Sequence, residues 1–179
     1  MRDCNSAPAV GLPLLISALL LGTACYRRPR PPINDRAKQE AEKTASDAAE
    51  KYKNARNIRD YVFSGFARAD ALGSFRKDRL LFASEAEDLQ AARDAFNQAS
   101  AKYLEAMNGS DESASDLHLR FFKLSKAYRK WAEIAELDRL ICLEAANIKD
   151  LGSFLDRAKD LDEKARRLND EVNQIITYA

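Results

Sequence analysis

The chain has 179 residues, the size of one domain, and its 29 Lys and Arg nearly balance 28 Asp and Glu, for a net charge of +1. This balance argues against a protein that binds nucleic acid through its overall charge, and we expect no nucleic-acid partner. Apolar residues make up 46% and charged residues 32%, which is typical of a folded protein. All five prolines lie at or before position 32 and only four glycines follow residue 33. The composition therefore disfavours an all-β fold, which needs many turns.

Residues 1–24 have the layout of a secretory signal peptide. A short leader with Arg2 precedes an apolar run over about residues 9–21, which is shorter than the roughly 20 apolar residues that span a bilayer. Three small residues then precede Cys25. The stretch that ends there reads Leu21-Gly22-Thr23-Ala24-Cys25.

This stretch resembles the lipobox of bacterial lipoproteins. The resemblance implies that the signal is cut before Cys25 and that this residue is lipidated, for instance with palmitate, so that the protein is held in the membrane of the bacterial cell envelope. Tyr26 follows the Cys where an Asp commonly retains a lipoprotein in the inner membrane, so the resemblance favours the outer membrane of a Gram-negative cell. Two alternatives stay open: an ordinary signal cut after Ala24, with Cys25 incidental, and a retained membrane anchor.

Residues 25–34 are interpreted as the lipidated Cys and a tether rich in Arg and Pro. Such Pro-rich stretches are extended at about 3.1 Å per residue, so this one spans roughly 20–30 Å. Its cations at Arg27, Arg28 and Arg30 would lie near lipid headgroups. Beyond the tether the only cysteine is Cys142, which excludes a disulfide framework in the mature domain.

Two long helices are predicted between residues 34 and 107. In the first, over 34–72, small and apolar residues recur every seven positions, with Arg59 as the exception to the pattern. In the second the repeat is cleaner, because aromatic and leucine positions alternate with alanines. Sevenfold repeats sustained in this way are typical of supercoiled helix seams. The seam positions of the second helix are Phe82, Leu89, Phe96, Tyr103, Ala92, Ala99 and Ala106.

A polar stretch at 108–115 predicts a loop, and two further helices are expected over about 116–150 and 154–178. We therefore predict an all-α, antiparallel four-helix bundle over residues 35–179, built of coiled-coil-like hairpins at about 35–107 and 116–178. The last helix has Phe154, Ala158, Leu161, Ala165, Leu168, Val172 and Ile175 in heptad register.

The tetrad Leu-Gly-Ser-Phe occurs twice, at 72–75 and 151–154. In both copies Gly can end a helix in the left-handed conformation and Ser can cap the next, which predicts turns at 73–74 and 152–153. The repeat suggests a duplicated hairpin, or chance combined with ordinary turn chemistry. Each Gly-Ser pair could instead kink a continuous helix.

The sequence offers little catalytic chemistry. The one histidine, His118, is interpreted as a surface or boundary residue, and Cys142 as a small buried hydrophobe. Carboxylates such as those at 85–88 and 160–163 are interpreted as solvated helix faces. No Glu-x-x-His, Walker or dinucleotide-binding motif occurs. We expect no catalytic residue, no cofactor and no metal site.

The third predicted helix is apolar on more than one side, which raises the question of what covers it. Its flank at Leu119 and Phe122 is hard to bury, because it lies at the helix start beside the polar loop. These two residues are therefore candidates for binding a protein partner or a second copy, with burial by adjoining helices as the alternative. Together these features predict a membrane-anchored envelope lipoprotein that acts as a non-enzymatic interaction or spacer module. The alternative is a helical binder of a small ligand or an unfolded client protein in the periplasm.

Overall fold

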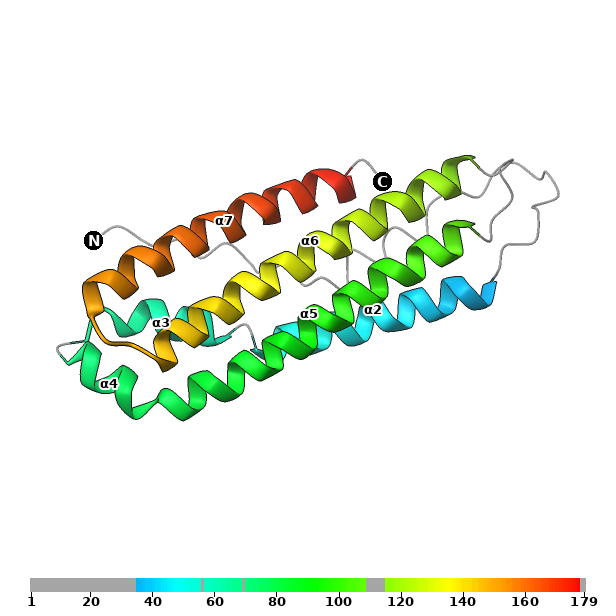
Figure 1. Ribbon diagram of the computed structural model, residues 1–179. Coiled ribbons are helices and arrows are strands. Elements are labelled where there is room, and N and C mark those ends of the chain that lie inside the picture. Colours follow the sequence, from blue (N-terminus) through cyan, green and yellow to red (C-terminus); the bar gives the residue numbers. More distant parts are fainter. Residues whose placement is uncertain (1–34, 56, 69, 109–114, 178–179) are drawn as a thin grey trace, which may run out of the picture.

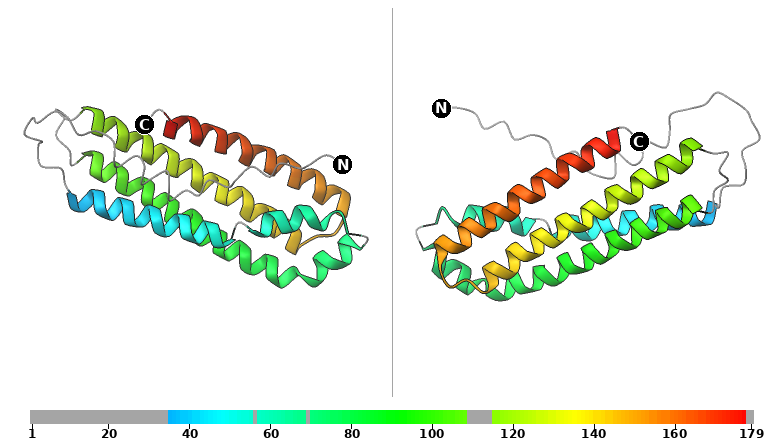
Figure 2. Two further views of the ribbon diagram at one scale, coloured as in Figure 1. Left: turned by 180° about the vertical axis from the view of Figure 1, so that it is seen from behind. Right: turned by 45° about the horizontal axis from the view of Figure 1, so that its top comes forward.

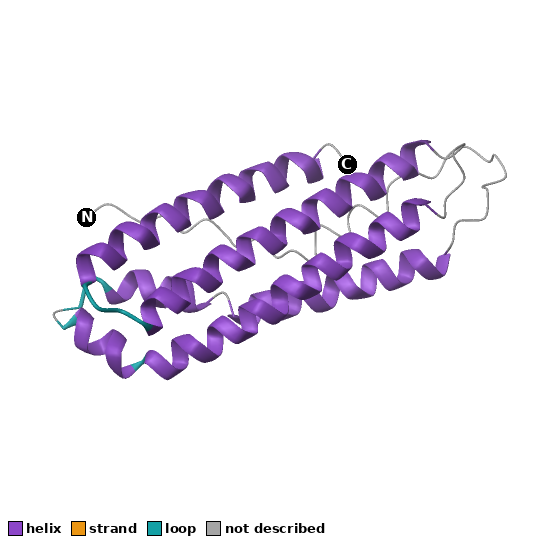
Figure 3. Ribbon diagram, viewed as in Figure 1, coloured by secondary structure: helices purple, strands orange, loops and turns teal. Residues whose placement is uncertain are grey.

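The computed structural model describes residues 35–55, 57–68, 70–108 and 115–177. Within these ranges it contains six helices and no strand (Figure 3), so the predicted all-α bundle is confirmed. The helices are α2 (Asp35–Ala55), α3 (Asn57–Gly65), α4 (Ala71–Lys77), α5 (Arg79–Asn108), α6 (Ser115–Ala146) and α7 (Leu151–Thr177).

The centre of the bundle is the antiparallel hairpin of α5 and α6. Helix α2 packs along α5, and α7 packs along α6 (Figure 1). The short helices α3 and α4 lie at the end where α6 turns back into α7, as both views in Figure 2 show. At the other end α2 begins beside the end of α5, where the ammonium of Lys102 lies 3.5 Å from a carboxylate oxygen of Glu40.

The core is an aromatic and alanine seam, as the heptads predict. All seven seam positions of α5 are buried. The Tyr52 ring lies 5.7 Å from that of Phe96 and 5.8 Å from that of Trp131, and the rings of Tyr103 and Tyr128 stack at 5.4 Å. Alanine on the facing helices lets the backbones approach around these rings.

The first predicted helix is divided in the structure. Instead of one helix over 34–72 there are α2 and α3, and a short α4 follows after a turn. Helix α3 ends at Gly65, where an added Cβ would lie 2.8 Å from the buried ring of Phe75. Only glycine therefore lets this turn close onto the core. The ring of Tyr61 is joined to the start of α5, because its hydroxyl donates to Asp78 at 2.6 Å.

The predicted turns at 73–74 and 152–153 are wrong by a few residues. Gly73 and Gly152 lie inside the first turns of α4 and α7, and neither has a positive φ, so they are neither turns nor kinks. The caps are aspartates: Asp70 accepts from the N–H of Gly73 at 3.0 Å, and Asp150 accepts from the N–H of Ser153 at 2.7 Å. A carboxylate satisfies a free helix N–H and opposes the helix dipole, so it serves here in place of the expected serine.

The aromatic residues of the two tetrads meet in the core. Phe75 and Phe154 are almost fully buried, and their rings contact edge to face at 5.6 Å. Phe66 contacts both rings, at 5.4 and 5.1 Å. The repeated tetrad therefore places one phenylalanine from each half of the chain in a shared cluster.

Candidate functional site

The two residues predicted to bind a partner lie at the surface. Leu119 is 52% exposed and Phe122 is 39% exposed, so the adjoining helices do not cover them. Leu104, near the end of α5, is also exposed. The two other large exposed apolar residues of the described chain, Leu80 and Leu81, lie at the start of α5, at the opposite end of the bundle.

A buried neighbour fixes the position of Phe122. Phe121 is 2% exposed and its ring lies 6.1 Å from that of Tyr103, which joins the start of α6 to the end of α5. The next residue is rotated by about 100° around the helix, so Phe122 points away from this contact. The ammonium of Lys126 lies 4.3 Å from the Phe122 ring centroid, in a cation–π contact.

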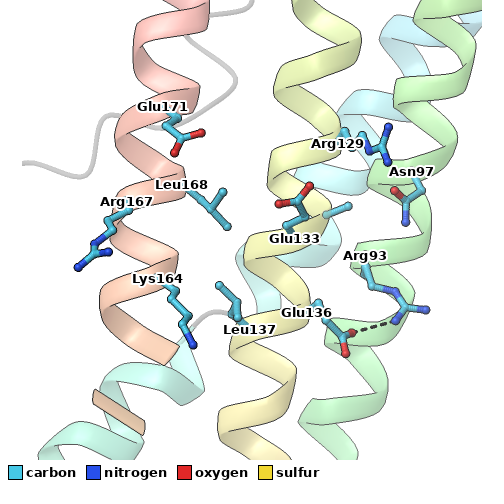
Figure 4. Close-up of a pocket in the computed structure, with 11 residues that line it drawn as sticks. Arg93, Asn97, Arg129, Glu133, Glu136, Leu137, Lys164, Arg167, Leu168 and Glu171 are labelled. Carbon is cyan, nitrogen blue, oxygen red and sulfur yellow. Dashed lines mark hydrogen bonds and ion pairs between the residues drawn. The ribbon is translucent and has the colours of Figure 1, made fainter. Parts of the chain in front are cut away.

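The exposed residues continue the face of an open groove. This groove has a volume of about 710 Å³ and runs over α6 between α5 and α7 (Figure 4). Phe122 lies seven residues before Arg129, and Leu104 lies seven residues after Asn97, and both Arg129 and Asn97 line the groove. Residues seven apart share a helix face, and Leu119 lies fourteen residues before Glu133, which also lines the groove, so Leu104, Leu119 and Phe122 lie on the groove-lining faces of α5 and α6, at the end of the groove. We name these three residues the apolar end patch.

Charged side chains dominate the groove itself. Seven of its eleven lining residues are charged, and Arg93 donates to Glu136 across α5 and α6 at 2.9 Å. Hydrogen bonds from Arg139 and then Arg93 lower the pKa of Glu136, which keeps this carboxylate ionised. An ion pair between Lys130 and Glu171 joins α6 to α7. The groove therefore carries charges of both signs, and two of these ion pairs join neighbouring helices.

A second group of charges lies inside the bundle. Asp138 on α6 is 1% exposed and accepts a 2.6 Å hydrogen bond from the hydroxyl of Tyr52. Its other carboxylate oxygen faces the guanidinium of Arg59 on α3, at 3.6 Å, and Arg59 also pairs with Asp162 on α7. Arg166 contacts the second oxygen of Asp162 at 2.9 Å. We name Tyr52, Arg59, Asp138 and Asp162 the Arg59 cluster. It joins four helices, and its three charged side chains are mostly shielded from water.

The Arg59 cluster explains the break in the heptad pattern and corrects one prediction. Arg59 occupies a seam position because two acids meet it there. Asp162, predicted to lie on a solvated face, is instead mostly buried against Arg59. Asp138 was not identified from the sequence. The one indication of a buried acid was Arg59, a cation at a seam position among apolar residues.

The remaining predicted residues are placed as follows. Cys142 is fully buried, and burial, with smaller effects of Asp138 and Glu85, raises the pKa of its thiol to about 12. The thiol is therefore protonated and shielded, as expected of a small buried hydrophobe. His118 lies at the boundary between core and surface. Cys25, the candidate lipidation site, lies outside the described residues.

The described residues contain neither a candidate membrane span nor a candidate metal site. No helix among them is both long enough and apolar enough to cross a bilayer. Within the same ranges, no three His, Cys, Asp or Glu side chains are grouped so that they could hold a metal ion. Comparison with protein-family models, with curated proteins and with solved structures found no match to the chain.

Proposed function

We propose that the protein is a membrane-anchored lipoprotein of the bacterial cell envelope, whose helical bundle is a non-enzymatic interaction or spacer module. The anchor is a lipid on Cys25, placed there by the lipobox-like stretch that ends at this residue. The bundle begins at Asp35, after the Arg- and Pro-rich tether.

The packed interior is the observation that carries the spacer part of the proposal. Aromatic, leucine and alanine side chains of α5 fill the seam from Phe82 to Ala106. The charged side chains inside the bundle pair with one another, as in the Arg59 cluster, and these pairs join the helices. An elongated bundle held together in this way keeps a fixed shape between the membrane and whatever contacts its surface.

Lipidation is tested by fatty-acid labelling of cells that express the wild-type chain or Cys25→Ser. We expect label and membrane sedimentation for the wild type, and neither for the variant, because only the thiol of Cys25 is available to the lipidating enzyme. Cys4→Ser is the matched control and should label like the wild type, since the signal peptide is removed. Equal labelling of wild type and Cys25→Ser would contradict the proposal.

Protein contacts are tested by crosslinking in intact envelopes, followed by identification of the crosslinked chains. An interaction module yields defined crosslinks that depend on residues of its surface. A spacer without a protein partner yields none, although it fractionates with the membrane.

The open groove supports a second candidate function, the binding of a small ligand or an unfolded client. Its charged rim surrounds the partly buried side chains of Leu137 and Leu168, which gives apolar contact beside charges of both signs. A binder of this kind should take up an apolar fluorescent dye such as anilinonaphthalene sulfonate in the groove. Leu168→Glu should abolish that uptake, whereas Leu80→Glu, far from the groove, should not. Identical uptake in both variants would contradict the binder.

A further inference from the structure

The end of the bundle that carries the apolar end patch is also the end at which the tether arrives. Helix α2 begins there, as the contact of Lys102 with Glu40 shows. Helix α5 ends and α6 begins at the same end, as the ring contact of Tyr103 with Phe121 shows (Figure 1). A lipid on Cys25 would be ten residues from Asp35, a distance of about 30 Å when this Pro-rich stretch is extended. The opposite end lies about 45 Å further away, the length of the 30-residue α5.

The charges of α6 are divided along its length. From Asp116 to Lys130 the helix has five cationic side chains and one acidic side chain. From Trp131 to Ala146 it has one cationic and four acidic side chains. The cationic half is the half next to the tether. The cationic residues of this half are Arg120, Lys123, Lys126, Arg129 and Lys130, of which Lys130 is paired with Glu171 on α7.

From these observations we infer that the apolar end patch, with the cationic half of α6, rests on the anionic lipid surface to which the protein is anchored. This inference rests on the proposed anchoring. Leu104, Leu119 and Phe122 lie within about 10 Å of the helix ends, which matches the depth at which apolar side chains enter the headgroup region. Lys126 lies against the Phe122 ring, so its ammonium can stay among the headgroups while the ring enters the interface. The partner is therefore a bilayer that contains an anionic lipid such as phosphatidylglycerol.

The test uses residues 26–179, which include all described residues, with a hexahistidine tag in place of Cys25. The tag holds the protein on vesicles through a nickel-chelating lipid, so the result does not depend on natural lipidation. An environment-sensitive fluorophore is attached at Leu119→Cys or, as the matched control, at Leu80→Cys. Buried Cys142, whose thiol stays protonated, is not labelled.

On vesicles of phosphatidylcholine with phosphatidylglycerol, we expect the emission of the probe at position 119 to shift to the blue. The probe at position 80 should have the same emission spectrum on vesicles as in buffer. The shift should shrink on pure phosphatidylcholine and in high salt, because the cations then contribute less. Without the tag, Lys126→Gln should weaken binding to the anionic vesicles about fivefold, the effect of one cation near such a surface.

Phe122→Glu separates docking from folding. Because Phe122 is partly exposed, this variant should keep its helicity and melting temperature, yet lose the blue shift at position 119. Leu81→Glu, at the other end of the bundle, should keep its helicity, its melting temperature and the blue shift at position 119. An unchanged spectrum at position 119 on anionic vesicles would overturn the inference. So would a blue shift that appears without vesicles and grows with protein concentration, because a second copy would then cover the patch. Failure of lipidation would be seen only in the labelling of Cys25.

Discussion

Phe96 lies where α2, α5 and α6 meet, with its ring against those of Tyr52 and Trp131 and with no exposed surface. We expect Phe96→Ala to lower the free energy of unfolding by about 3–5 kcal/mol, because a cavity remains where the ring was. The measurement is urea unfolding followed by circular dichroism. Leu80→Ala removes a similar apolar side chain that is 77% exposed, and should change the free energy by less than about 0.5 kcal/mol. Similar losses in both variants would place Phe96 outside the core.

Arg59 is the mostly buried cation that faces both Asp138 and Asp162. Arg59→Met should cost about 3–5 kcal/mol of stability, since it leaves buried Asp138 without its counter-charge and leaves Asp162 with only the exposed Arg166. Adding Asp138→Asn and Asp162→Asn to this variant should restore much of the loss, which urea unfolding would measure. Arg157→Met breaks the exposed pair with Glu144 and should cost less than about 1 kcal/mol. Equal effects of Arg59→Met and Arg157→Met would contradict a role for the Arg59 cluster in holding the helices.

Cys142 predicts a specific dependence of stability on alkaline pH. The pKa of its thiol is about 12 in the folded state, against an ordinary value of about 9. Its contribution to stability is therefore complete below pH 9 and is lost as the pH rises from 9 through 12, because only the unfolded chain ionises readily there. The difference in unfolding free energy between wild type and Cys142→Ala should shrink over this range. A constant difference would show that the thiol is not shielded.

At the scale of the elements, identical tetrads have different surroundings. A Cβ on Gly73 would lie 2.2 Å from the carboxylate of Asp70, which caps α4, whereas a Cβ on Gly152 would meet only Asp150 at an ordinary 3.5 Å. Gly152→Ala should therefore stabilise the protein by up to about 1 kcal/mol through helix propensity. Gly73→Ala should be less stable than Gly152→Ala by about 1 kcal/mol, because it displaces the cap. Thermal unfolding of the two variants compares them directly, and equal stability would contradict the difference in capping.

The two tetrads also show what turn chemistry in a sequence leaves undetermined. Gly followed by Ser can end one helix or begin the next, and Asp70 and Asp150 are equally common caps. Which of these residues caps depends on how the chain enters the helix, and that is set by Phe75 and Phe154 reaching the core. Propensity alone therefore misplaced the turns by a few residues.

At the scale of the whole molecule, repeat spacing predicted most of the bundle because heptads report a buried face directly. The seam of α5 from Phe82 to Ala106 was found in this way. The partners of Arg59 were not found, since Asp138 and Asp162 come from helices whose rotation about the seam a sequence does not give. The exposure of Leu119 and Phe122 followed from their place at the start of a helix beside a polar loop.

Helix α7 has one neighbour for much of its length. Its first turns are held by Phe154 in the aromatic cluster and by Asp162 against Arg59, but its later turns pack mainly on α6. A segment with few partners opens without the rest of the molecule, so its amide protons should exchange with solvent deuterium in advance of global unfolding. In native-state hydrogen exchange, we expect the amides from about Leu168 to Thr177 to exchange first and those of α5 near Phe96 last. Equal protection of both would mean that α7 opens only when the whole bundle does. Earlier exchange in α7 than in α5 would mean that the last turns of α7 open as a separate unit. Their opening would uncover the underlying face of α6 while the aromatic seam stays closed.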